Sequence, residues 1–108
     1  MKTGDIVLIS FPFSELTQVK IRPAVVVTET KDKYKDLVLV AVSSQIPATL
    51  SSAEIVLKPD SLNGLRASSV IKVDRVFTLK SEKVVANIGR LSLNQCSEFS
   101  KVFKSLID

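Results

Sequence analysis

The fold is decided by residues 24–42, which read AVVVTETKDKYKDLVLVAV. Two runs of mostly β-branched and aliphatic residues, 24–27 and 37–42, flank a charged segment at 31–36. Such residues favour strands, and a continuous apolar run of this length is typical of a strand that is well buried. The stretch therefore predicts a β-hairpin, with the charged segment as its loop.

Shorter β-type runs lie on both sides of this hairpin, at residues 6–9, 54–57, 70–74, 76–79 and 84–88. Turn signals separate them. Asn63-Gly64 is a strong one, and Ser81-Glu82 marks a connection before the last run. This spacing predicts a mainly antiparallel sheet.

The C-terminal segment has a helical period instead. Ser92 is placed to cap a helix, with Gln95 at the capping-box position. One face of that helix then carries Cys96, Phe99, Phe103 and Leu106. The expected fold is mainly β with a helix (α+β): a strongly curved antiparallel sheet or small barrel, closed by the C-terminal helix.

Composition limits the functions that are open to the chain. At 108 residues, 45% hydrophobic and 24% charged, it is expected to form one domain over residues 1–108. Neither a membrane-spanning run nor a signal peptide is recognised, which favours the cytoplasm and no membrane partner. No histidine and one cysteine exclude a Ser-His-Asp triad and a Cys/His zinc cluster, so no metal or cofactor is expected. The net charge of +4 favours anionic partners, although many soluble proteins carry such a charge.

Two polar segments are candidates for chemistry. In KIRP, residues 20–23, Pro23 restricts Arg22 to extended geometry at a strand entrance, where a guanidinium can bind phosphate through two donors. Ser43, Ser44 and Gln45 end the most apolar run and can present polar groups to a ligand. On composition alone, a surface salt bridge and a strand cap explain these segments more simply.

A set of short motifs, taken in order along the chain, favours a functional role for these segments over the simpler explanations. They are GDIVL (4–8), FPFS (11–14), KIRPAVVV (20–27), VAVSSQ (40–45), GL (64–65), SVI (69–71), DRVFTL (74–79) and IGRL (88–91). Each motif is weak alone, but their order and spacing are specific. Through them the chain resembles the MazF/PemK family of toxins from type II toxin–antitoxin systems.

The resemblance implies a fold, an activity and partners. The fold would be an SH3-like small β-barrel with a C-terminal helix, working as a homodimer. The activity would be sequence-specific, metal-independent cleavage of single-stranded RNA, chiefly messenger RNA. The partners would be that RNA, a cognate antitoxin and, together with the antitoxin, operator DNA.

The resemblance also carries residue roles. Arg22 and Ser43 match the catalytic positions, and Lys20, Ser14, Ser44 and Gln45 are expected to bind substrate. RNA brings its own nucleophile, the 2′-hydroxyl, so the expected products are a 2′,3′-cyclic phosphate (or 3′-phosphate) and a 5′-hydroxyl. The sequence does not identify the general base, and Lys20 and Glu15 are candidates to assist.

Two departures keep alternatives open. Serine stands at position 43 where the family often has threonine, and residues 16–19 read LTQV where many relatives have a glycine. The altered loop keeps a catalytically inactive module open, one that binds the antitoxin or acts as corepressor. A CcdB-like toxin that targets gyrase is the other alternative, and the lack of any tryptophan argues against it.

Overall fold

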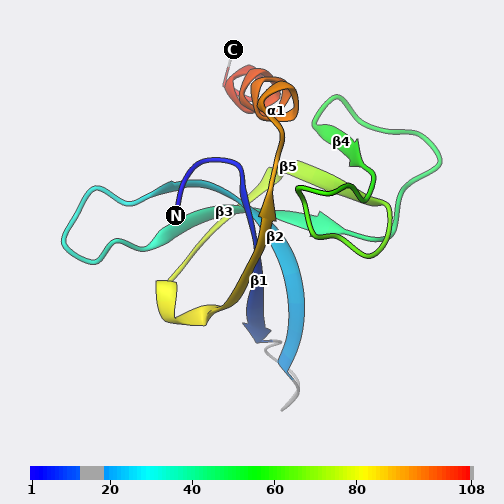
Figure 1. Ribbon diagram of the computed structural model, residues 1–108. Coiled ribbons are helices and arrows are strands. Elements are labelled where there is room, and N and C mark those ends of the chain that lie inside the picture. Colours follow the sequence, from blue (N-terminus) through cyan, green and yellow to red (C-terminus); the bar gives the residue numbers. More distant parts are fainter. Residues whose placement is uncertain (13–18, 108) are drawn as a thin grey trace.

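The computed structural model describes residues 1–12 and 19–107. Within them lie β1 (Asp5–Pro12), β2 (Val19–Glu29), β3 (Leu37–Ser43), β4 (Glu54–Leu57), β5 (Ser69–Leu79), a short 3₁₀ helix (Ser81–Lys83), β6 (Val84–Arg90) and α1 (Leu93–Ser105) (Figure 1). The prediction of a mainly β protein with one C-terminal helix is confirmed.

The strands form one antiparallel sheet in the order β4-β5-β3-β2-β1-β6, with the predicted β2–β3 hairpin at its centre. Thr30 N–H donates to the Asp36 carbonyl at 2.8 Å and closes the loop of that hairpin. The sheet is not closed, since no ladder in the described residues joins the edge strands β4 and β6. Residues after β4 contact β6 instead, where Arg90 N–H donates to the Leu62 carbonyl at 3.0 Å.

β5 unites the two runs expected at 70–74 and 76–79 in one bent strand. Val40 of β3 pairs with Val76, but the next residue, Ala41, pairs with Lys72. Three residues of β5 therefore bulge from this ladder, and one of them, Val73, donates its N–H to the Ala53 carbonyl at 2.9 Å instead. Bulges bend strands and increase their twist. This bulge accordingly turns β5 around the core.

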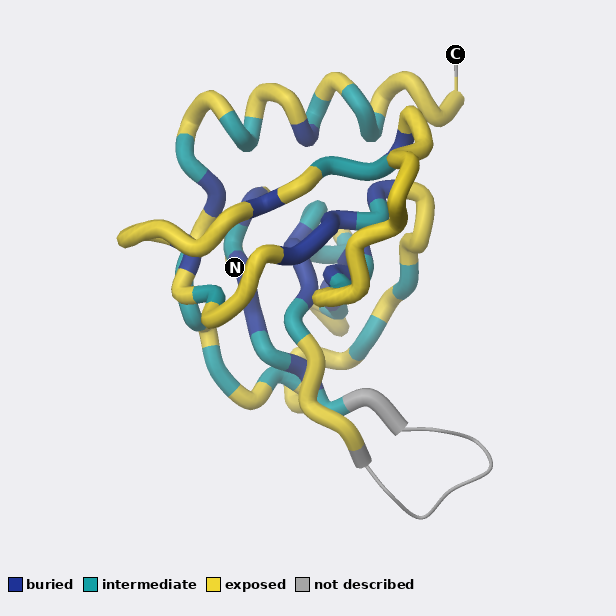
Figure 2. Tube along the Cα trace, turned by 90° about the vertical axis from the view of Figure 1, so that its right-hand side faces the viewer, coloured by how far each residue is buried: buried dark blue, intermediate teal, exposed yellow. Residues whose placement is uncertain are grey.

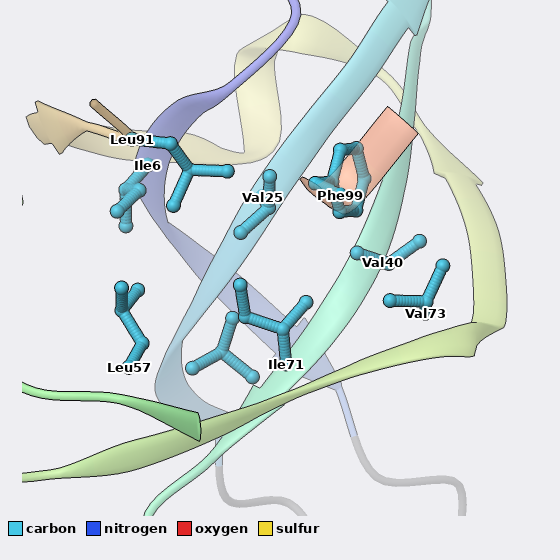
Figure 3. Packing of buried hydrophobic residues seen from close by; sticks show 9 residues of the cluster. Ile6, Val25, Val40, Leu57, Ile71, Val73, Leu91 and Phe99 are labelled. Atoms are coloured by element: carbon cyan, nitrogen blue, oxygen red, sulfur yellow. The ribbon is translucent and has the colours of Figure 1, made fainter. Parts of the chain in front are cut away.

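The core occupies both faces of the central strands, which explains their continuous apolar runs. One cluster contains Ile6, Val25, Val40, Val42, Leu57, Ile71, Val73, Leu91 and Phe99 (Figure 3). The other, on the alternate side chains, contains Val7, Ile9, Ala24, Val26, Leu37 and Leu39, with Phe77, Leu79 and Val84 packed against it.

α1 lies across one side of the sheet and covers the first cluster (Figure 2). The predicted capping box is confirmed: Gln95 N–H donates to Ser92 Oγ at 3.2 Å, and Ser92 N–H donates to Gln95 Oε1 at 2.8 Å. Phe99 is buried as predicted. Leu106 was expected on the same face but is 39% exposed, because the helix ends at Ser105. No helix in the described part of the chain has the length and apolar character needed to span a membrane.

Candidate active site

A groove opens where β2 and β3 part. Their ladder ends at the pair Ala24 and Ala41, and the next residue of β2, Pro23, has no N–H to donate. Past this point β2 stays paired with β1, and β3 stays paired with β5. The groove between them has a volume of about 390 Å³ and is lined by Ile9, Arg22, Pro23, Ala41, Val42, Ser43, Ser44, Gln45, Lys72, Arg75 and Phe77.

Both residues predicted to be catalytic face this groove. The interpretation of Arg22 as a strand entrance was wrong, because it lies inside β2, paired with Ile9 of β1. Continuing the β2–β3 register two residues beyond Ala24 and Ala41 places Arg22 opposite Ser43. Side chains alternate between the two faces of a strand. Arg22 and Ser43 each lie two residues from the last ladder pair, so their side chains project from the same face of the sheet as that pair. The fold thus brings together two residues that are distant in sequence.

The two side chains have donors directed at the groove. Arg22 is exposed, and its side chain makes no hydrogen bond or ion pair with residues 1–12 and 19–107. Ser43 Oγ accepts a hydrogen bond from the Gln45 N–H at 3.1 Å. That bond uses an acceptor lone pair and leaves the Ser43 O–H hydrogen available to a ligand oxygen. Together they offer a guanidinium fork and a hydroxyl donor to an anion.

The groove contains two cations that were not predicted as site residues, Lys72 and Arg75. Lys72 interrupts the apolar run 70–73, a signal that was readable in the sequence. Arg75 lies in the β5 bulge, and no sequence motif predicts that bulge. With Arg22 they make three cationic side chains, and among residues 1–12 and 19–107 no carboxylate lines the groove. The groove is therefore suited to an anion.

Glu54 of β4 holds one of these cations in place. Its Oε2 lies 3.4 Å from Lys72 Nζ, and the two residues are paired in the β4–β5 ladder. The pKa of Glu54 lies below its ordinary value, chiefly because the Ser51 N–H donates to Oε1 at 2.8 Å, with Lys72 adding to the effect. The carboxylate thus stays charged and restrains the Lys72 side chain beside the groove.

The remaining predicted residues fall into three groups. Ser44 and Gln45 line the groove, as expected for substrate-binding residues. Lys20 is exposed on β2, two residues before Arg22, but is not among the lining residues. Ser14 lies outside the described residues, as does Glu15. In the rest of the chain, no three His, Cys, Asp or Glu side chains gather in a group able to hold a metal ion.

Known structures share this fold. The Mycobacterium tuberculosis toxin MazF-mt6 matches with a TM-score of 0.70 at 16% identity, covering 96% of each chain. An endoribonuclease in complex with its cognate antitoxin, from a mycobacterial species, matches with a TM-score of 0.73 at 11% identity, covering 97% of this chain and 92% of that one. At such identities the likeness shows the fold. No curated protein sequence matches significantly.

Family membership rests on the sequence itself. The model of one protein family matches residues 2–107, almost the whole chain. Its description is that of a PemK-like, MazF-like toxin of a type II toxin–antitoxin system, so the family expected from the motifs is confirmed. The chain belongs to the PemK-like, MazF-like toxins of type II toxin–antitoxin systems.

Proposed function

We propose that this toxin is a sequence-specific, metal-independent endoribonuclease that cleaves single-stranded RNA, chiefly messenger RNA, in the groove between β2 and β3. The observation that carries the proposal is the register that sets Arg22 opposite Ser43 in a groove with three cationic side chains. RNA carries a phosphate and its own nucleophile, so neither a histidine nor a protein nucleophile is needed.

Cleavage proceeds by attack of the 2′-hydroxyl on the adjacent phosphorus. The 2′-hydroxyl loses its proton to solvent, the P–O bond to the 5′ oxygen of the next nucleotide breaks, and that oxygen takes up a proton from solvent, which leaves a 2′,3′-cyclic phosphate and a 5′-hydroxyl. Arg22 meets the non-bridging oxygens with paired N–H donors and stabilises the charge that develops there. Ser43 donates its O–H to a phosphate oxygen and holds the group in line.

The cations on β5 serve binding rather than bond cleavage. Lys72 and Arg75 come from β5, on the side of the groove away from β2, so they meet neighbouring phosphates of the same RNA strand. Ser44 and Gln45 continue the lining from the end of β3 and contact the substrate as polar groups. Lys20, exposed on β2 two residues before Arg22, assists in holding the RNA, and so does Ser14.

The partners follow from membership of a toxin–antitoxin family. A cognate antitoxin binds the toxin and blocks the groove, and the two together bind operator DNA. The toxin works in the cytoplasm as a homodimer, each copy folding as one domain. We propose further that the segment after β4 completes an SH3-like barrel around the open sheet, which the hydrogen bond from the Arg90 N–H to the Leu62 carbonyl supports.

End-mapping of cleaved RNA tests the proposed activity. Purified protein, incubated with single-stranded RNA and a chelator, is expected to leave 5′-hydroxyl ends at defined sequences. Arg22→Ala is expected to abolish these ends, while Lys31→Ala, which removes an exposed cation from the hairpin loop, leaves them unchanged. Intact RNA together with gyrase-dependent DNA breakage would support the CcdB-like alternative, and antitoxin binding without cleavage would support the inactive module.

A further inference from the structure

A second groove adjoins the first and shares Pro23 and Ser44 with it. It has a volume of about 360 Å³ and is lined by Leu8, Pro23, Ser44, Gly64, Leu65, Arg66, Ala67, Ser69 and Ile88. Leu8 and Pro23 are neighbours in sequence of Ile9 and Arg22, which line the first groove. Because side chains alternate along a strand, the two grooves open on opposite faces of the β1–β2 pair. They meet where β2 and β3 part.

The chemistry of the second groove differs from that of the first. Its walls are mostly apolar, from Leu8, Pro23, Leu65 and Ile88, and Arg66, which is exposed, is the one charged residue of the described chain that lines it. An apolar slot with one cation beside it suits a nucleobase whose flanking phosphate meets the cation. In the part of the chain that the structure describes, no carboxylate lines this groove to repel RNA.

The walls of this groove are held in place by the loop after β4. Asn63 is fully buried, and its Oδ1 accepts from the Leu65 N–H at 3.0 Å while its Nδ2 donates to the Lys58 carbonyl at 2.8 Å. Gly64 packs so closely on β6 that an added Cβ would meet the Ile88 carbonyl. Residues 64–67 are thus positioned before any ligand arrives, which lowers the entropic cost of binding.

We propose that the second groove binds the nucleobase of a nucleotide next to the cleaved phosphodiester, on the same RNA strand, and that Arg66 contacts the phosphate of that nucleotide. The inference rests on the proposed function, which puts the cleaved phosphate at Arg22 and Ser43. The RNA strand passes from one groove to the other at Ser44, which follows β3 and lines both. A base bound in the second groove contributes to the sequence specificity of cleavage.

Binding of an RNA that cannot be cut tests the proposal separately from cleavage. The probe is a fluorescent, single-stranded 2′-fluoro RNA of mixed sequence, which lacks the attacking hydroxyl, and the measurement is fluorescence anisotropy. Ala67→Phe places an aromatic ring in the groove from an exposed loop position, and Arg66→Ala removes the cation. Lys58→Ala is the matched control, because it removes an exposed cation from the same loop outside the groove.

We expect Ala67→Phe and Arg66→Ala each to weaken binding about tenfold, the effect of losing one base or phosphate contact. Lys58→Ala should bind as the wild type does. Unchanged binding by both groove variants overturns the proposal, even if they lose antitoxin binding. An equal loss of RNA binding in Lys58→Ala also overturns the proposal, because the weakening would then follow from the lower overall charge and not from the groove. If the wild type binds the probe but cuts no RNA, the proposed cleavage fails while the groove assignment stands.

Discussion

Arg22 of β2 and Ser43 of β3 each lie two residues beyond Ala24 and Ala41, the last pair of the β2–β3 ladder, and both line the same groove. Pro23 lies where that ladder stops and has no N–H with which to extend it. The strands part there, so the guanidinium and the hydroxyl face an open groove instead of a closed sheet.

Arg22→Ala should lower the rate of RNA cleavage by about 100-fold or more, since it removes the donors that stabilise charge on the phosphate. The cleavage rate of Arg22→Lys should lie between those of the wild type and Arg22→Ala, because an ammonium keeps the charge but not the paired donors of a guanidinium. The measurement is kcat/KM on a defined RNA, with thermal unfolding to show that both variants fold. Activity of Arg22→Ala equal to wild type would remove this residue from the mechanism.

Ser43→Ala should also reduce cleavage, by about tenfold or more, because the phosphate loses a hydroxyl donor. Ser43→Thr retains the hydroxyl and should keep most of the activity. Single-turnover rates compare the two variants directly. If Ser43→Thr and Ser43→Ala lose cleavage activity equally, the hydroxyl is not the functional group at this position.

Much of the site was visible in the sequence, and the reasons for the failures are specific. The apolar runs, the Ser92 capping box and the motifs around Arg22 and Ser43 are local patterns, and the structure confirms the elements they predict. Arg75 was missed because its place depends on a bulge in β5, which arises from long-range pairing with β3. Lys72 was readable as a charge in an apolar run, but its partner Glu54 is distant in sequence.

Glu54→Gln should change how stability depends on pH. The pKa of Glu54 is lowered in the folded protein from its ordinary value of 4.5, so the folded state favours the charged carboxylate. Its stabilising effect is complete above that ordinary value and is lost as pH falls through the lower folded pKa. The wild type should therefore exceed Glu54→Gln in stability at neutral pH, and the difference should shrink in acid.

Urea unfolding at several pH values measures that difference. Glu82→Gln is the control, because Glu82 is an exposed carboxylate in the 3₁₀ helix. Its stability should follow that of the wild type more closely across the series. A gap between wild type and Glu54→Gln that is the same at acid and neutral pH would show that ionisation of Glu54 is not the cause.

Gly89→Ala should destabilise the fold by roughly 2 kcal/mol or more, since close backbone contacts have no room for a methyl group. A Cβ at Gly89 would overlap the backbone of Leu62 and Asn63, in the loop that packs on β6. Ser61→Ala, an exposed change in the same loop, should have little effect. Chemical denaturation gives both values. Near-wild-type stability of Gly89→Ala would mean that the loop is not held tightly against β6.

The most direct test of the central claim is a single-atom change in the RNA. One oligonucleotide contains the mapped cleavage site, and its partner differs only by a 2′-deoxy sugar on the 5′ side of the cut. Attack by the 2′-hydroxyl in the groove of Arg22 and Ser43 predicts that the first is cut, with a 2′,3′-cyclic phosphate and a 5′-hydroxyl as ends, and that the second stays intact. Cleavage of the deoxy-substituted strand at the same bond would contradict the mechanism.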